Sequence, residues 1–120
     1  MFGRLSILAA GLLAVTATQG QAQNAQRQAE RDLFAKIVEI PTVEGQTAEF
    51  KKLTALLSSE FRKAGITDVI VKDHDGTQTL IARWPAAKLS GLKPILLMAH
   101  MDVVEAKESD WKYPPFKFRE

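Results

Sequence analysis

A histidine and an aspartate, one residue apart, follow an apolar run in the last part of the chain. The run begins at Pro94 and continues to Ala99, and His100 and Asp102 come directly after it. Alternate residues of an extended chain lie on the same side, so we expect these two side chains to point the same way. Neutral imidazole is a good zinc ligand, and a nearby carboxylate fixes its tautomer and raises its basicity. The spacing therefore indicates part of a metal site, although a histidine at this place can also be purely structural.

The apolar run predicts the element that would position this pair. An unbroken apolar segment of strand length behind a proline is typical of a strand that is buried on both faces. Open α/β sheets carry their chemistry at the carboxyl ends of such strands, which is where His100 falls. We therefore predict a buried strand over residues 94–99.

The sequence from Pro94 to Phe116 resembles one family of enzymes. The apolar run is followed by His-x-Asp-Val-Val, then by a short loop with Trp111 and the pair Pro115-Phe116. This order and spacing is similar to the first metal-binding signature of the dinuclear zinc metallopeptidases. That family includes aminoacylases, glutamate-type carboxypeptidases, dipeptidases and succinyl-diaminopimelate desuccinylase.

The resemblance implies a role for each residue of the motif. His100 is similar to the family's ligand of one of two zinc ions, and Asp102 to the carboxylate that orients that histidine. Cobalt or manganese can replace zinc in such nitrogen and oxygen sites. Val103 and Val104 would pack the strand end and keep the site dry, and the aromatic residues of the following loop would pack against the sheet.

Two positions depart from the family pattern. Glu105 stands where the family tends to have proline, and Pro114 where it often has aspartate. Both changes alter the loop without removing a ligand. A third, weaker similarity is Ile40-Pro41-Thr42, because a loop at this place comes near the substrate end of the family's site. A plain connector between two helices explains that loop equally well.

The implied fold class is α/β, as the N-terminal part of a mixed-sheet zinc-peptidase catalytic domain: two helices, then a hairpin, then the buried strand. The family's bridging aspartate, its Glu-Glu pair and a final histidine would all come beyond Glu120, and the carboxylates of Glu105, Glu108 and Asp110 do not match their positions. We therefore interpret residues 23–120 as a truncated part of the domain that is inactive by itself. The strand-like alternation in which the sequence stops favours the same interpretation.

Composition restricts the other possibilities. A chain of 120 residues is about one small domain, and its net charge of +2 is too small to indicate a nucleic-acid partner. There are no cysteines, so a metal site would have to use His, Asp and Glu. A glycine-rich phosphate loop and a Gly-x-Ser-x-Gly motif are both absent from the sequence, which argues against a nucleotide-binding domain and a serine hydrolase.

Residues 1–22 have the pattern of a secretory signal peptide. Arg4 gives a positive start, Leu5 to Val15 form an apolar stretch, and small residues precede a cleavage site after Ala22. The stretch is short for a membrane span, although an uncleaved anchor remains the alternative. We expect export to the periplasm or the exterior, with no membrane association after cleavage.

Two amphipathic helices are predicted next. The first covers residues 24–39 and ends before Pro41, and the second covers residues 47–64, with Thr47 as its N-cap and Gly65 after its end. The apolar positions of these helices recur at three- and four-residue steps, as a core-facing stripe requires. They are Leu33, Phe34, Ile37 and Val38 in the first helix, and Phe50, Leu53, Leu57, Phe61 and Ala64 in the second.

A β-hairpin follows, with strands over residues 68–72 and 77–84 and a turn over residues 73–76 that contains Asp-Gly. Asp73, His74 and Asp75 are a possible metal cluster. Neighbouring side chains diverge, however, and aspartate is common in turns for its local hydrogen bonds, so a plain turn is the simpler interpretation.

The sequence thus leaves two classes of function open. The first is part of an exported metallohydrolase that cleaves amide bonds in small peptides or N-acyl amino acids. The complete protein would hold two zinc ions and is compatible with a homodimer. The second is a small exported α/β binding or interaction domain without catalysis, in which His100 is structural.

Overall fold

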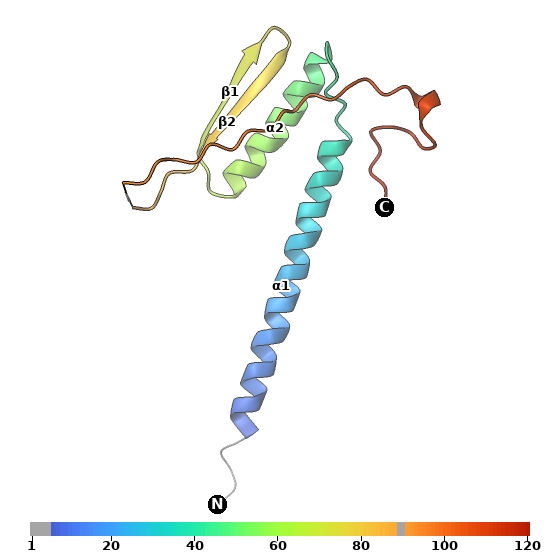
Figure 1. The fold of residues 1–120 in the computed structure, drawn as a ribbon. Helices are drawn as coiled ribbons and strands as arrows, with labels where there is room; N and C mark the ends of the chain where they lie inside the picture. Colours follow the sequence, from blue (N-terminus) through green and yellow to red (C-terminus); the bar gives the residue numbers. More distant parts are fainter. Residues whose placement is uncertain (1–5, 89–90) are drawn as a thin grey trace, which may run out of the picture. The chain divides into compact units, whose positions relative to one another are not determined.

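The computed structural model describes residues 6–88 and 91–120, with the backbone alone described for residues 6–20. The elements are two helices, α1 (Ser6–Val38) and α2 (Thr47–Lys63), two strands, β1 (Asp68–His74) and β2 (Thr77–Arg83), and a short 3₁₀ helix, η1 (Glu108–Asp110). Figure 1 shows them along the chain. The chain divides into two units, Met1–Ile37 and Val38–Glu120, each of which is described by itself.

The first unit is almost entirely the helix α1. Its end at Val38 confirms the predicted stop before Pro41, but it begins at Ser6 and not near residue 24. Alanine, leucine and glutamine are good helix formers and fill much of the earlier segment, so the helix continues through residues that the sequence assigned to a signal peptide. Arg4, the positive residue of that segment, lies outside the described residues. Neither described α-helix is long and apolar enough to cross a membrane.

The second unit is organised around α2. Phe50 and Leu53, two members of the predicted stripe, are only 2% and 4% exposed, whereas Ala64 is exposed. The first turn of the helix hydrogen-bonds to the carbonyl of Gln46, which makes Gln46 the N-cap. The prediction of Thr47 as the N-cap was therefore wrong by one residue.

Gly65 ends α2 as predicted. Its φ of +86° lies in the left-handed region, where a residue without Cβ is favoured. The amide of Gly65 donates to the carbonyl of Arg62 at 3.0 Å, and the amide of Ile66 donates to that of Phe61 at 2.9 Å. This pair of bonds is the Schellman motif, and the accompanying apolar residue, Ile66, is buried.

The predicted hairpin is confirmed, although β1 continues two residues beyond its predicted end and β2 stops one residue before its own. β1 and β2 pair antiparallel from Asp68 opposite Arg83 to His74 opposite Thr77. Asp75 and Gly76 alone form the loop, with φ of +41° and +94°. Positive φ at both positions is the pattern of a type I′ turn, whose twist matches that of the strands, so the pairing continues up to His74.

The hairpin lies beside α2 (Figure 1) and contacts it through both strands. The turn approaches the start of the helix closely, since a Cβ at Gly76 would lie 3.0 Å from Thr47 Oγ1. Farther along, the hydroxyl of buried Thr54 hydrogen-bonds to the side-chain oxygen of Gln78. The α/β class of the fold, with two helices followed by an antiparallel hairpin, is thus confirmed.

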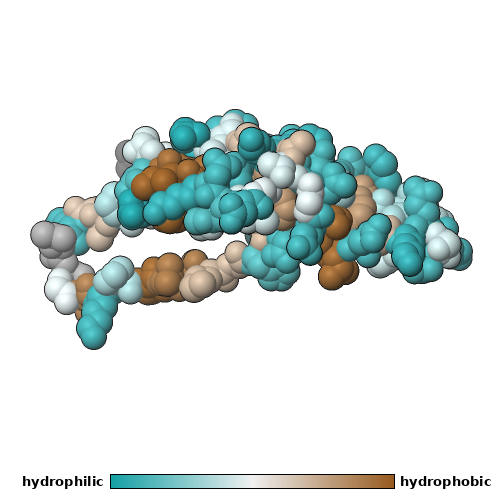
Figure 2. Space-filling view, turned by 90° about the horizontal axis from the view of Figure 1, so that it is seen from above, coloured by the Kyte–Doolittle hydropathy of each residue, from teal (hydrophilic) through white to brown (hydrophobic). Residues whose placement is uncertain are grey.

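The prediction of a buried strand over residues 94–99 was wrong. This run is extended but belongs to no strand, and Ile95, Leu96, Leu97 and Met98 are between 79% and 88% exposed. Figure 2 shows their brown apolar surface along the strip of chain that leaves the body of the unit. A strand needs hydrogen-bonding neighbours, and the described sheet consists of β1 and β2 paired with each other. The strand-like alternation over residues 116–120 forms no strand either, for the same reason.

The loss of unfolding free energy on truncating a leucine should be large in the buried face of α2 and small in the exposed run at residues 95–98. We expect Leu53→Ala to destabilise the chain by about 2–5 kcal/mol, because it leaves a cavity in the packed face of α2. The same change at Leu97, which is 88% exposed, should stay within about 0.5 kcal/mol. Urea unfolding followed by circular dichroism measures both. Equal losses in the two variants would show that the run at 95–98 is buried in solution.

Candidate metal-binding site

The side chains of His100 and Asp102 point to the same side of the chain. His100 Nδ1 lies 3.4 Å from Asp102 Oδ1 and 2.9 Å from the backbone oxygen of Asp102. This confirms that the two side chains lie on the same side, as expected for residues i and i+2 of an extended chain, although these residues belong to no strand. The imidazole and the carboxylate are 83% and 68% exposed, while Met101 between them is partly covered.

The contact with the backbone oxygen determines which tautomer of the neutral His100 ring is compatible with the structure. A carbonyl oxygen only accepts hydrogen bonds, so His100 Nδ1 must carry the proton to make this bond. The lone pair of the neutral ring then lies on Nε2. This is the arrangement in which histidines bind metals, with the other ring nitrogen held by a carboxylate or a carbonyl.

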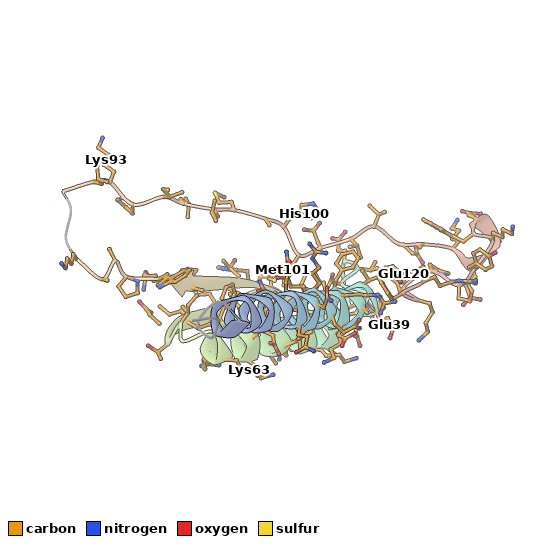
Figure 3. All side chains as sticks on the ribbon, turned by 90° about the horizontal axis from the view of Figure 1, so that it is seen from below. Glu39, Lys63, Lys93, His100, Met101 and Glu120 are labelled. Carbon is orange, nitrogen blue, oxygen red and sulfur yellow. The ribbon has the colours of Figure 1, made fainter. Side chains whose placement is uncertain are left out.

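A buried threonine from the loop between α1 and α2 holds the chain at this point. The Thr42 hydroxyl donates to the backbone oxygen of Met101, and the amide of Val103 donates to the backbone oxygen of Thr42 at 3.1 Å. Thr42 is only 1% exposed. Figure 3 shows His100 and Met101 on the same extended segment as Lys93.

Sequence reasoning named Thr42 in the weak family similarity Ile40-Pro41-Thr42, but it did not predict a contact between Thr42 and the His-x-Asp motif. The loop at residues 42–46 was equally compatible with a plain connector, and Thr42 is 59 positions from Met101. Only the pairing of Ile40-Pro41-Thr42 with the His-x-Asp motif, both similar to one family, could have suggested the contact.

The other candidate ligands do not join His100. Within residues 6–88 and 91–120, no group of three or more His, Cys, Asp or Glu side chains could hold a metal ion. In the hairpin, Asp73 and His74 lie next to each other on β1, and Asp73 instead accepts a 2.7 Å bond from Gln78. The hairpin cluster is therefore an ordinary strand end and turn.

The apolar surroundings expected for the site are also absent from the described part of the chain. Val103 and Val104 are 41% and 85% exposed, so the prediction that they keep the site dry was wrong. Trp111 is 60% exposed, so the prediction that it packs against the sheet was wrong. In the same loop, the Arg119 guanidinium lies 3.6 Å from the centre of the Tyr113 ring.

Comparison with known proteins adds no relative. No family model, no curated protein and no solved structure matches the chain. The chemistry of the site is therefore argued from its own donors: one imidazole nitrogen that can bind a metal, and one carboxylate beside the other nitrogen.

Removal of the carboxylate should change the tautomer balance of His100. We expect Asp102→Ala to lower the ratio of Nδ1–H to Nε2–H by about two- to fivefold, the range of an exposed charged contact. Long-range ¹H–¹⁵N correlation spectra of the neutral rings measure this ratio. The chain has one other histidine, His74, whose spectrum serves as an internal control. An Nδ1–H to Nε2–H ratio at His100 that is the same in Asp102→Ala and in the parent chain would contradict the orienting role of Asp102.

Proposed function

We propose that this chain is the N-terminal part of an exported, zinc-dependent metallohydrolase that cleaves amide bonds in small peptides or N-acyl amino acids. The observation that carries the proposal is the geometry of His100. Its Nδ1 lies 2.9 Å from the backbone oxygen of Asp102, which leaves the lone pair on Nε2 to bind a metal ion. The similarity of the surrounding motif to the first signature of the dinuclear zinc metallopeptidases supplies the reaction class.

The two residues have different roles in this proposal. His100 binds one zinc ion through Nε2, and Asp102 keeps the ring in the tautomer that makes this possible. A zinc ion held there would supply the chemistry of such sites, which is to lower the pKa of a water molecule and to polarise a carbonyl group. The one ligand fits zinc, since imidazole nitrogen is among its usual ligands, and cobalt or manganese are compatible substitutes.

The proposal assigns this chain one metal ligand of a larger set. In this proposal the remaining ligands and the general base would come from the rest of the protein. The exposed apolar run at residues 95–98 supports this view. In a complete mixed sheet, further strands would pair with this run and cover it, as its composition requires.

Export of the protein follows from the segment at residues 1–22, which we propose to be a signal peptide cleaved after Ala22. The mature enzyme then acts in the periplasm or outside the cell. A homodimer of the complete protein is compatible with this proposal.

A second candidate function is a small exported binding domain without catalysis. The 83% exposure of the His100 side chain favours it, because a metal-binding histidine in a finished site is normally more enclosed. Sequencing of the locus past the codon for Glu120 separates the two. A glycine-rich segment with aspartate and a Glu-Glu pair would support the hydrolase, and a stop codon with normal accumulation of the short product would support the binding domain.

Zinc binding by the chain itself should be weak and should depend on His100. In a zinc titration followed by the histidine ring resonances, we expect the His100 signals to shift and those of His74 to stay unchanged. His100→Ala should abolish binding, and Asp102→Ala should weaken it by about tenfold, the lower end of the range for residues that orient a ligand. His74→Ala is the matched control, and equal effects of the two histidine variants would contradict the assignment.

Hydrolysis should require the complete gene product. With zinc bound, that product should release amino acids from dipeptides or N-acyl amino acids, and His100→Ala should lower kcat/KM by at least a hundredfold, while His74→Ala leaves it unchanged. The 120-residue chain should show no activity in the same assay. If the 120-residue chain hydrolyses the substrates and His100→Ala abolishes this activity, the proposal that the other ligands lie outside this chain is wrong.

A further inference from the structure

We infer that Thr42 is a positioning residue for the metal ligand His100, acting through the backbone of Asp102; this inference rests on the proposed function of that pair. Thr42 touches neither the imidazole ring nor the carboxylate in any hydrogen bond described above. Its two bonds go to backbone atoms on either side of Asp102.

These two bonds fix both peptide planes that flank Asp102. The Thr42 hydroxyl donates to the carbonyl of Met101, which belongs to the plane before Asp102. The Thr42 carbonyl accepts from the amide of Val103, which belongs to the plane after it. A residue whose two neighbouring planes are both held has little freedom left in φ and ψ.

The second bond also directs the acceptor that His100 uses. In a trans peptide the N–H and the C=O point in opposite directions. The amide of Val103 points towards Thr42, so the carbonyl of Asp102 points away from it, and there it meets His100 Nδ1 at 2.9 Å. The loop thereby selects the position of the acceptor that holds the ring in its Nδ1–H form.

Thr42 is itself held firmly enough for this role. Its side chain is 1% exposed, and the residue before it, Pro41, has a φ restricted by its ring. The amide of Thr42 donates to Ile40 at 3.0 Å, and the amide of Val43 donates to Pro41 at 2.8 Å. A hydrogen bond from a buried hydroxyl is also stronger than one in water, because few water molecules compete for it.

The test compares two substitutions of Thr42. Thr42→Val keeps the shape of the side chain and removes the hydroxyl, whereas Thr42→Ser keeps the hydroxyl and removes a methyl group. We expect Thr42→Val to lower the Nδ1–H to Nε2–H ratio of His100 by about two- to tenfold, the range for loss of one hydrogen bond. Thr42→Ser should stay within about twofold of the parent chain, and His74 should be unchanged in both variants.

A result in which Thr42→Val and the parent chain give the same His100 ratio would overturn the inference. Should Thr42→Val fail to fold, hydrogen exchange in the parent chain decides instead. The amide of Val103 donates to Thr42 and should exchange more slowly than the amide of Val104, whose residue is 85% exposed. Exchange of both amides at their intrinsic, unprotected rates would also overturn the inference.

Zinc titration of the same variants separates this inference from the proposed function. A His100 ratio that follows the Thr42 hydroxyl supports the positioning role even when no variant binds zinc, and in that case only the proposed function fails. Zinc binding at His100 that is equally tight in Thr42→Val and in the parent chain overturns the positioning role and leaves the proposed function standing.

Discussion

The candidate site depends on one long-range contact, the pair of hydrogen bonds between Thr42 and the segment from Met101 to Val103. This contact joins the loop before α2 to a segment that belongs to no helix or strand. Because Thr42 is buried, the contact is protected from water, whereas the histidine and aspartate it supports are exposed. A rigid point next to exposed donors is what a metal site needs, since ligands that are already oriented lose less freedom on binding.

The sequence predicted those parts of the fold that depend on local interactions. The helix α2 follows from the spacing of Phe50 and Leu53 and from Gly65 at its end, and the hairpin follows from Asp75-Gly76. In each case the residues that determine the structure lie within a few positions of one another. The boundaries differ from the prediction, because Gln46 rather than Thr47 caps the helix and the two-residue turn lets β1 continue to His74.

The run at residues 94–99 could not be predicted in the same way. Its composition is that of a buried strand, but whether an apolar segment forms a strand is decided by the strands beside it. The described sheet has two strands, and Ile95 to Met98 remain exposed. The composition of a segment thus indicates whether it favours a buried environment. Whether the folded chain provides that environment depends on the strands that lie beside the segment.

The site was predicted in its local part and missed in its distant part. The i, i+2 spacing was enough to place His100 and Asp102 on one side, because it needs only an extended backbone. The contact between Thr42 and Met101 was not predicted, since the 59 positions between them carry no periodic signal. The pair at His100 and Asp102 thus depends on local spacing, and its support by Thr42 depends on a long-range contact.

The most direct test of the central claim, that His100 is a zinc ligand oriented by Asp102, is X-ray absorption spectroscopy of the zinc-loaded complete gene product. Zinc ligation by His100 predicts imidazole scattering with a nitrogen at about 2.0–2.1 Å from zinc, reduced in His100→Ala and unchanged in His74→Ala. An identical zinc environment in the parent protein and His100→Ala would contradict the claim, and His100 would then be a structural residue of a binding domain.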